Sequence, residues 1–463
     1  MAKVEFVVPS VLNKGNGEKK ISIEADSLQD AFSKVSDNMG EDFRRKVLDL
    51  NGKPRSLINI YINGKNMRFG GGMSTPLHDG DSIYILPAVA GGAPSAAEET
   101  GEEKPVEDKA RLTGDDLQRY SRQIMLEEIG FEGMEKLRSA KVCVVGVGGI
   151  GNPIVTQLTA MGIGKLRIVD RDVVEISNLH RQHLYTDEDI GRVKVEAAAE
   201  RLRRVNPAVE IEPVPVSVSK YTADEIVKGF DIVIDALDSV DARYALNDAC
   251  IKYSIPFVYA GALGMLGSVC TILPGKSACL RCIFPALNED DMPTCSTEGV
   301  HPSVLYLVGS IQVSEAVKII TGQQPTLVNK LLYIDLNELS FEKIQMSRQQ
   351  ECPSCGVSGG KEAEGKGLAV AQLIIEELCG RDRGKRTWTV TPAEPATINL
   401  NTVIRNAESL GYQVKTRGNL GITAVNPNRL SVSFLSSGSA TIVGAKDEQD
   451  AVSIYNTFVK DRN

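Results

Sequence analysis

The stretch KVCVVGVGGIGNPIVTQLTAMGIGKLRIVD, residues 141–170, carries the strongest structural signal in this chain. It reads as an apolar strand, a glycine-rich turn, a helix and a second apolar strand that ends at Asp170. Neither strand alternates polar and apolar residues, so both indicate a parallel sheet that is covered on both faces. Strands and helices in this order are typical of a Rossmann-like doubly wound α/β fold.

Four glycines in this stretch, Gly146, Gly148, Gly149 and Gly151, follow the first strand and open the helix. At such a place glycines permit a tight turn and let backbone N–H groups approach a phosphate. Asp170 follows Gly151 by 19 positions, where a carboxylate can accept the hydroxyls of a ribose. The pattern predicts a site for a nucleotide with an unphosphorylated ribose. A glycine-rich turn that binds nothing is the alternative.

Polar and cationic residues follow this acid, namely Asn178, Arg181, Gln182 and Lys194. Arginine offers a bidentate fork to phosphate oxygens, and lysine offers a point charge. Asp238 follows the apolar strand DIVIDAL and is expected at a carboxyl end of the sheet, as a holder of magnesium. Together these residues suit a triphosphate. For each of them alone, a solvated or ion-paired surface role is the alternative.

Length and charge limit the class of protein. The chain has 463 residues, with 52 Lys plus Arg against 60 Asp plus Glu and a formal net charge of -8. This length predicts two to four domains, and the acidic balance argues against a protein that coats nucleic acid or an anionic membrane. No run of 18 apolar residues occurs, and the start MAKVEFVVPS lacks the features of a signal peptide. We therefore expect a cytoplasmic protein with reduced cysteines.

The patterns divide the chain into three modules and two linkers. Residues 1–92 predict a small mixed α/β unit, and residues 93–112 an acidic linker. Residues 113–357 hold the alternating strands and helices of the sheet domain, and residues 358–380 a second linker. Residues 381–463 predict a small α+β module with a strand, a helix, three strands and a closing helix.

The motifs GVGGIG, IVDRD and NLHRQ, followed by Lys194 and Asp238, resemble the adenylating domain of the MoeB/ThiF/HesA group of ubiquitin-activating-type enzymes. The resemblance covers about residues 113–357. It implies an adenylyltransferase that uses ATP and Mg²⁺ and forms an acyl-adenylate. It further implies that Arg181, Lys194 and Asp238 are catalytic, and that Arg122 reaches into the nucleotide site of a neighbouring protomer, which predicts a homodimer.

Two cysteine pairs, Cys279-Leu-Arg-Cys282 and Cys352-Pro-Ser-Cys355, supply four soft ligands, the number that a tetrahedral structural zinc requires. The 70 positions between the pairs exceed the spacing of a zinc ribbon, so folding must bring them together. Redox pairs and isolated turns are the alternatives on spacing alone. The family resemblance favours Zn²⁺, since its members carry two such pairs at these places.

Cys295 lies in the polar stretch MPTCSTEGVHPS, where an exposed loop is expected. The acyl-accepting or persulfide-carrying cysteine of the family stands at the matching place, so the resemblance implies a catalytic role. Against this, no lysine or arginine nearby in the sequence favours a thiolate, and some members of the family do not depend on the cysteine. Its use therefore stays open at this point.

The first module ends in DGDSIYILPAVAGG, residues 79–92, and resembles the β-grasp sulfur carriers of the MoaD/ThiS type. Two glycines without side chains can pass through a narrow channel. The resemblance implies that the carboxylate of Gly92 becomes adenylated, so the chain joins an activating enzyme to its own substrate. Because Gly92 is amide-bonded to Ala93, we expect a separate peptidase to cut between them. The alternative is that the enzyme acts on free carriers.

The sequence thus predicts ATP-dependent adenylation of the C-terminal glycine of a ubiquitin-like sulfur carrier, after which a sulfur donor displaces AMP. The final acceptor stays open among molybdopterin, a thiolated tRNA base, thiazole and protein lysines, with molybdopterin weakly favoured by the length of the first module. The alternative functions are an NAD- or FAD-dependent oxidoreductase and a non-catalytic ubiquitin-like scaffold.

The last module carries 11 basic and 7 acidic residues within 381–463 and has no rhodanese signature. Its stretch RLSVSFLSSGSATIVGAKDEQDAVSIYNTFVK resembles one repeat of TATA-binding protein. Such proteins bind the minor groove with two repeats, and only one is present here. We therefore expect protein docking or dimerisation from this module, and no binding of nucleic acid.

Overall fold

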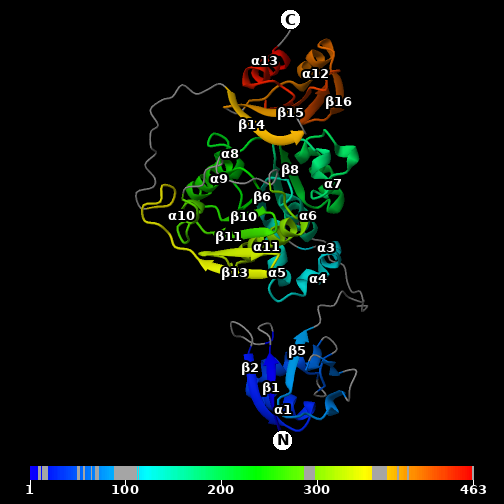
Figure 1. Ribbon diagram of the computed structural model, residues 1–463, viewed down its shortest axis with the longest axis vertical. Helices are drawn as coiled ribbons and strands as arrows, with labels where there is room; N and C mark the ends of the chain where they lie inside the picture. The colour runs from blue at the N-terminus through cyan, green and yellow to red at the C-terminus, as the bar shows by residue number, and fades with distance from the viewer. Residues whose placement is uncertain are drawn as a thin grey trace. The chain divides into compact units, whose positions relative to one another are not determined.

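The computed structural model describes residues 1–8, 12, 19–49, 53–55, 58–63, 65–67, 72–87, 112, 114–285, 298–356, 373–382, 385–393 and 396–460. The chain forms two compact units, Met1–Pro105 and Val106–Asn463, and each is described by itself (Figure 1).

The first unit is a five-stranded mixed sheet with a helix packed against it. The strand order is β2-β1-β5-β3-β4, and β1 runs parallel to β5 and antiparallel to β2. The helix α1 begins after Ser27, whose hydroxyl accepts the N–H of Asp30, and it buries Phe32 against Phe6 with ring centroids 4.9 Å apart. This is the expected β-grasp arrangement. Its elements are β1 (Ala2–Val8), β2 (Lys19–Ala25), α1 (Leu28–Met39), α2 (Glu41–Val47), β3 (Ile58–Ile62), β4 (Lys65–Asn66), η3 (Gly72–Ser74) and β5 (Ser82–Pro87).

The second unit contains an eight-stranded sheet in the order β13-β12-β11-β10-β9-β6-β7-β8. The strands from β10 to β8 are parallel, as the sequence predicts, whereas β11, β12 and β13 extend the sheet with antiparallel pairing. The strands are β6 (Lys141–Val145), β7 (Lys165–Val169), β8 (Glu210–Val214), β9 (Ile232–Asp235), β10 (Phe257–Leu263), β11 (Leu266–Ile272), β12 (Lys330–Asp335) and β13 (Ser340–Gln345).

Helices cover both faces of this sheet and form two separate apolar cores, which explains why the strands read as continuously apolar. One core takes side chains from α5 (Gly130–Ser139), α6 (Gly151–Met161), α7 (Lys194–Val205) and α11 (Pro302–Thr321). The other takes side chains from α8 (Ala223–Val227), α9 (Val240–Lys252) and α10 (Leu280–Ile283). Two short helices, α3 (Gly114–Arg119) and α4 (Ser121–Ile124), precede α5.

The strand order reverses between β6 and β9. The chain runs outward from β6 to β7 and β8 and then returns to the other side of β6 to form β9. In open α/β sheets the ligand crevice lies outside the carboxyl ends of the strands at such a switch point. The glycine-rich turn after β6 and Asp238 after β9 both lie at this edge.

The helix α11 is long and apolar enough to cross a membrane by length and composition, the one such helix among the described residues. Its buried Gln312 donates hydrogen bonds to the carbonyl oxygens of Asp235 at 2.7 Å and Val258 at 2.9 Å, beneath β9 and β10. Together with its apolar contacts, this makes α11 a core helix of the sheet domain.

The C-terminal module is a six-stranded antiparallel sheet in the order β14-β15-β19-β18-β17-β16, packed against two helices (Figure 1). Four strands lie between the helices where three were expected, and β14 begins at Leu373, so the second linker is shorter than expected. The elements are β14 (Leu373–Asp382), β15 (Lys385–Pro392), α12 (Leu400–Ser409), β16 (Gln413–Arg417), β17 (Gly421–Val425), β18 (Ser431–Leu435), β19 (Ala440–Val443) and α13 (Glu448–Val459).

Candidate functional site

The glycine-rich turn between β6 and α6 is shaped mainly by close packing. Gly146 has a φ of 97°, and a Cβ on it would collide with the carbonyl oxygen of Ala236 at the end of β9. A Cβ on Gly151 would collide with the carbonyl oxygen of Gly146. By contrast, a Cβ on Gly148 would meet nothing nearer than the amide nitrogen of Gln182 at 3.8 Å. Of these three glycines, Gly148 is therefore the one with open space beside it.

Asp170 joins the turn to the next loop. Its carboxylate accepts the N–H of Val147 at 2.8 Å and the N–H of Asp172 at 2.8 Å. Burial raises the pKa of Asp170, and the charge of Lys194 opposes this rise. The predicted ribose acid thus lies beside the turn, at the carboxyl end of β7, as its position in the sequence requires.

Lys194 is the first residue of α7 and is almost fully buried. Its ammonium group forms an ion pair with Asp172 at 2.9 Å. A buried lysine keeps its charge only with such a partner. Asp172 is therefore a further candidate site residue, which the sequence could have indicated as the second acid of IVDRD.

The segment NLHRQ, residues 178–182, begins at the last residue of a short 3₁₀ turn, η4 (Ile176–Asn178). The side chain of Asn178 caps this turn by accepting the N–H of Glu175 at 3.1 Å, and Arg181 donates to the carbonyl oxygen of Ser177 at 2.7 Å. Gln182 is 3% exposed, and its side-chain oxygen has no hydrogen-bond partner among the described residues. A buried, unpaired amide oxygen beside the glycine turn fits a site that is completed by a polar ligand.

Acidic residues that follow β7 and β9, Asp172 and Asp238, both act on the charge of Arg171. Burial lowers the pKa of its guanidinium group, but the negative charges of Glu376, Asp172 and Asp238 raise it by more. The net result is a raised pKa of Arg171. Asp238 itself is exposed just beyond β9. The structure therefore brings together Asp238 and the segment 170–172, although these lie more than 60 positions apart in the sequence.

The loop that carries Asp238 is anchored by Asp235, which is fully buried at the end of β9. One carboxylate oxygen accepts the N–H of Leu237 at 2.9 Å, and the other lies 3.3 Å from the guanidinium of Arg243. Arg243 in turn donates to the carbonyl oxygens of Leu237 and Ala260. Burial raises the pKa of Asp235 to about 6, against the opposing charge of Arg243.

Arg122 lies apart from this group within the same chain. It is exposed on α4, and the neighbouring Gln123 donates to the carbonyl oxygen of Met161 at 2.9 Å. Met161 is the last residue of α6, whereas the glycine turn opens that helix. A helix of 11 residues is about 16 Å long, so Arg122 lies near the opposite end of α6 from the turn. Gly92 and Cys295 lie outside the described residues.

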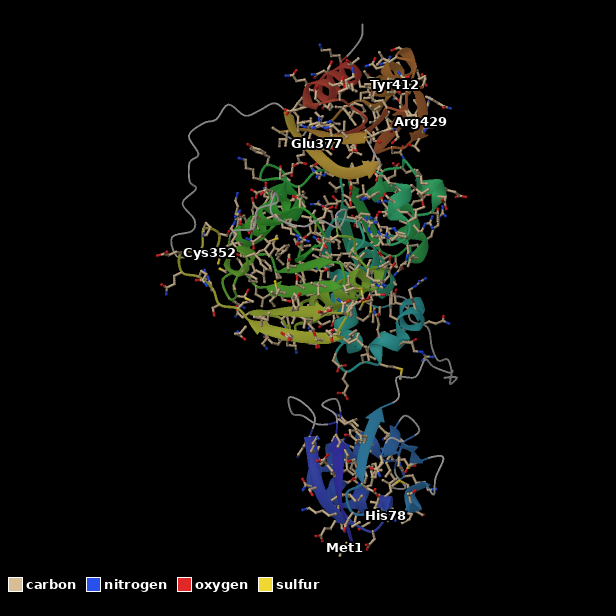
Figure 2. The ribbon with its side chains drawn as sticks, in the orientation of Figure 1. Met1, His78, Cys352, Glu377, Tyr412 and Arg429 are labelled. Atoms are coloured by element: carbon tan, nitrogen blue, oxygen red, sulfur yellow. The ribbon has the colours of Figure 1, made fainter. Side chains whose placement is uncertain are left out.

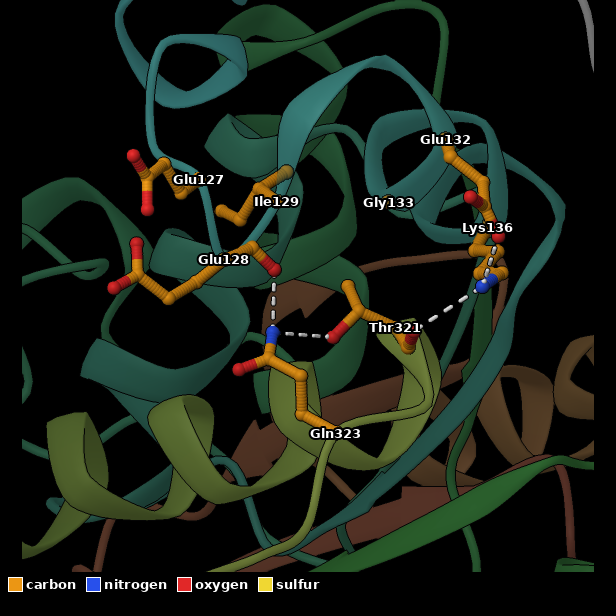
Figure 3. Close-up of a pocket in the computed structure, with 8 residues that line it drawn as sticks. All are labelled: Glu127, Glu128, Ile129, Glu132, Gly133, Lys136, Thr321 and Gln323. Carbon is orange, nitrogen blue, oxygen red and sulfur yellow. Dashed lines mark hydrogen bonds and ion pairs between the residues drawn. The ribbon is translucent and has the colours of Figure 1, made fainter.

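Figure 3 shows a pocket that contains none of the predicted nucleotide-binding residues. In it, Lys136 donates to the carbonyl oxygen of Thr321 at 3.2 Å, and Gln323 donates to the hydroxyl of Thr321 at 2.9 Å. The bond of Lys136 ties the end of α11 to α5, which leads into the amino end of β6. The pocket lies away from the carboxyl ends of the strands, so it is not the expected place for a nucleotide. Its lining residues are Glu127, Glu128, Ile129, Glu132, Gly133, Lys136, Thr321 and Gln323.

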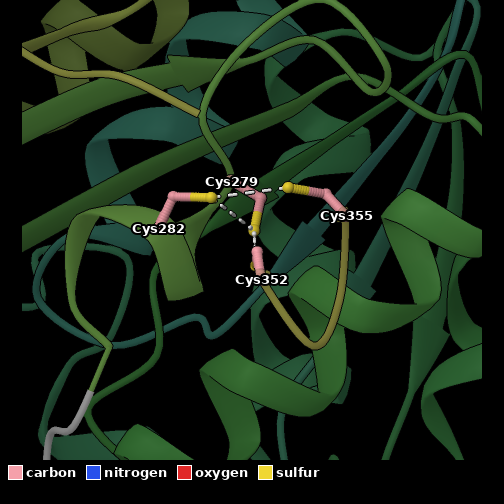
Figure 4. Close-up of side chains that lie close together, drawn as sticks. All are labelled: Cys279, Cys282, Cys352 and Cys355. Atoms are coloured by element: carbon pink, nitrogen blue, oxygen red, sulfur yellow. Dashed lines mark hydrogen bonds between the residues drawn. The ribbon is translucent and has the colours of Figure 1, made fainter. Parts of the chain in front are cut away.

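The four predicted zinc ligands come together from two distant segments (Figure 4). Their sulfur atoms all lie within 4.8 Å of one another; Sγ of Cys279 is 3.9 Å from that of Cys282 and 3.5 Å from that of Cys352. The sulfur atoms of Cys282 and Cys355 are 3.4 Å apart. Four thiolates at about 2.3 Å from a tetrahedral zinc would lie ~3.8 Å from one another. The cluster therefore fits a structural zinc that holds the segment around Cys352, labelled in Figure 2, to α10.

The backbone around the cluster also fits thiolate ligands. The N–H of Gln349 points to the sulfur of Cys282 at 3.4 Å, and the guanidinium of Arg348 donates to the carbonyl oxygen of Cys355. A donor that faces a sulfur atom, as the N–H of Gln349 does, stabilises a thiolate and orients it, whereas the bond of Arg348 holds the backbone at Cys355.

Comparison with known proteins places both units in families. The model of the ThiF family matches residues 120–354, and that of the ThiS family matches residues 14–92. The SAMP-activating enzyme E1 of Haloferax volcanii is 41% identical over 249 residues, which are 54% of this chain and 92% of that protein. The sulfur carrier protein adenylyltransferase of Thermus thermophilus is 39% identical over 252 residues, which cover 53% of this chain and 93% of that protein. The adenylyltransferase and sulfurtransferase MOCS3 of Sus scrofa is 40% identical over 254 residues, which cover 54% of this chain and 56% of that protein.

We expect one zinc ion per chain, and we expect Cys352→Ser to lose it and to lower the thermal unfolding midpoint, because a structural zinc contributes directly to folding. Metal analysis by mass spectrometry and thermal unfolding measure both effects. Cys250→Ala is the matched control, since Cys250 is buried on α9 but does not belong to the cluster. Full zinc content in Cys352→Ser would contradict the assignment.

The buried carboxyl of Asp235 predicts a pH dependence of stability. Its pKa in the folded state, about 6, lies above the ordinary value of 3.8, so its contribution is fully present below about pH 4 and is lost as the pH rises through 6. Two pKa units correspond to on the order of 3 kcal/mol. We expect Asp235→Asn to remove this loss in urea unfolding measured between pH 4 and 7. The exposed Asp187→Asn is the control, and an unchanged pH dependence in Asp235→Asn would refute the prediction.

Proposed function

Because the chain belongs to the ThiF family, we propose that its second unit adenylates the C-terminal glycine of a ubiquitin-like sulfur carrier at the expense of ATP. The observation that carries this proposal is the ThiS family match on the same chain, which supplies a carrier of the required kind. The relatives named as adenylyltransferases and as a SAMP-activating enzyme support it. An oxidoreductase would leave the carrier unit, Arg181 and Lys194 without a role.

The chemistry is an in-line displacement at the α-phosphorus of ATP. A carboxylate oxygen of the terminal glycine forms a bond to the α-phosphorus, the bond from this phosphorus to the bridging oxygen of the β-phosphate breaks, and pyrophosphate leaves with the electron pair. No general base takes part, since the carboxylate already carries its charge. A sulfur nucleophile from a separate donor then attacks the acyl carbon and releases AMP.

The residues at the carboxyl ends of β6, β7 and β9 serve this reaction in distinct ways. Asp170 binds the ribose, and the backbone at Gly148 approaches the phosphates. Arg181 and Lys194 stabilise the negative charge that develops at the reacting phosphorus. In the absence of nucleotide, Asp172 holds Lys194 charged and in place, 2.9 Å away. Gln182 offers its side-chain oxygen, which has no partner within the described part of the chain, to a donor on the nucleotide.

Two metal ions belong to the proposal. Magnesium would be held at Asp238, where it would neutralise charge on the triphosphate. Zinc would be held by the four cysteines and would have a structural role only, because all of its coordination positions would be filled by protein.

The position of Arg122, near the far end of α6, supports a homodimer in which this residue completes the site of the partner protomer. We place the protein in the cytoplasm, where the cysteines stay reduced. The predicted acidic linker, residues 93–112, has roughly 20 residues, and a random coil of this length spans on the order of 25 Å, so a tethered carrier would reach a millimolar effective concentration. A peptidase that cuts after Gly92 is a further proposed partner.

ATP–pyrophosphate exchange tests the proposed function. We expect exchange that depends on a carrier, residues 1–92, that ends at Gly92, and we expect Arg181→Ala and Lys194→Ala each to lower the rate about 100- to 1,000-fold while the fold is retained. His180→Ala is a matched control, since His180 is exposed beside Arg181. Exchange that does not require the carrier, or near-normal rates in both variants, would overturn the proposal.

The covalent order of the chain yields a second test. Since Gly92 is amide-bonded to Ala93, no adenylate forms on it until the chain is cut. We expect intact-mass spectrometry of the protein from its native cell to find a fragment that ends at Gly92. A Gly92→Pro variant should abolish this fragment. If native protein contains full-length chain alone, the enzyme acts on separate carriers instead.

A further inference from the structure

The C-terminal module contacts two segments of the sheet domain that hold two of the predicted nucleotide-binding residues, Asp170 and Lys194. These segments, residues 170–174 and 191–196, lie side by side, since the N–H of Lys194 donates to the carbonyl oxygen of Asp172 at 2.9 Å. Asp170 is on the first segment and Lys194 on the second. A change in the position of either segment therefore moves a group that faces the nucleotide.

The carbonyl oxygen of Gly191 is held by two hydroxyl groups of the C-terminal module. Thr416 on β16 and Thr423 on β17 stand opposite each other, and both donate to this oxygen at 2.8 Å. Thr423 is 6% exposed, so water does not compete freely for its bond. Two donors on one carbonyl group fix the chain three residues before Lys194.

A third contact holds the first turn of α7. Glu196 occupies the third position of the helix, from which such a side chain often bonds back to its own helix start. Here its carboxylate instead accepts the N–H of Asn419 at 2.7 Å. Gly418 allows this approach, because a Cβ at that position would collide with the carboxylate of Glu196.

The start of α7 needs support from outside the helix. Its N-cap residue is Val193, whose side chain makes no capping hydrogen bond. The first N–H groups of a helix have no partner within it, and a side-chain cap usually fixes them. Leu435 of β18 is buried in the same apolar core as α7, so the module packs against this region as well as bonding to it. The ion pair of Arg171 with Glu376, at 2.6 Å, is partly exposed and contributes less.

From these contacts we propose that the C-terminal module positions Lys194 for adenylation, with Thr416, Thr423 and Glu196 as positioning residues. The proposal rests on the proposed function, in which Lys194 stabilises charge on the reacting phosphate. The module fixes the chain on both sides of Lys194 and so sets the place of its ammonium group relative to the triphosphate. A shift of about 1 Å in a charge-stabilising group can cost up to about 100-fold in rate.

Single-turnover adenylation of a separate carrier, residues 1–92 ending at Gly92, by the full chain tests this role. We expect the double variant Thr416→Val/Thr423→Val to slow the reaction at saturating ATP by about tenfold, because valine keeps the shape of threonine without its hydroxyl. Thr416→Ser/Thr423→Ser should restore the rate. Glu196→Ala, in the sheet domain, should give a similar loss without a change inside the module. Ser437→Ala is the control: its hydroxyl bonds the carbonyl oxygen of Pro215, outside both segments.

A double-mutant cycle separates positioning of Lys194 from a general structural role. In the Lys194→Ala background, the threonine variant should cause little further loss, since its effect acts through Lys194. The fluorescence of Trp388, the one tryptophan in the chain and a buried residue of the module, reports whether the variants fold.

The outcomes distinguish the two proposals. Wild-type rates in a folded threonine variant and in Glu196→Ala, or a full tenfold further loss on the Lys194→Ala background, would overturn the positioning role. If the threonine variant does not fold, the rate of Glu196→Ala and the double-mutant cycle of Glu196→Ala with Lys194→Ala test the positioning role in its place. If the wild-type chain forms no carrier adenylate, the proposed function is overturned instead. In that case the affinity for a non-hydrolysable ATP analogue tests the positioning of Lys194, and equal affinities of wild type and Glu196→Ala would overturn it as well.

Discussion

At the end of β6 the backbone passes so close to its neighbours that Gly146 and Gly151 have no room for a Cβ. The carbonyl oxygen of Ala236, just beyond β9, meets the turn at Gly146, so the ends of two adjacent parallel strands are fixed against each other. The turn also presents the N–H of Val147 to Asp170. The positions of the acid after β7 and of the loop after β9 therefore both depend on this one close approach.

Charge compensation follows from that geometry. Several acids and bases gather where the strands end, and each of the buried ones has a partner of opposite sign: Lys194 has Asp172, and Asp235 has Arg243. Burying an unpaired charge would be far more costly than burying a paired one. In the proposed reaction, a triphosphate at this edge would meet cations that are already ordered, so less reorganisation would be needed.

Much of this architecture could be predicted from local patterns. The strands 141–145 and 165–169 and the helices 151–161 and 194–205 agree closely with the apolar periodicity, and the two cysteine pairs do converge. The antiparallel strands β11 to β13 were missed because direction is set by pairing partners and not by composition. The bonds of Thr416 and Thr423 to Gly191 could not be foreseen either, since they join residues more than 220 positions apart. The roles of Arg122, Gly92 and Cys295 still rest on resemblance.

The cysteine cluster has a consequence for how the protein folds during its synthesis. Cys279 and Cys282 lie 70 or more positions ahead of the residues that complete the cluster. At a synthesis rate of about 5 to 20 residues per second, the first pair leaves the ribosome roughly 4 to 14 s before the second. During that interval the first two thiols lack the other two cysteines, and the edge of the nascent sheet beyond β11 stays open until β12 and β13 are made, shortly before Cys352. With zinc bound as proposed, metal capture would mark the completion of this part of the chain, and a cell short of zinc would accumulate newly made protein in which this edge of the sheet is loosely held.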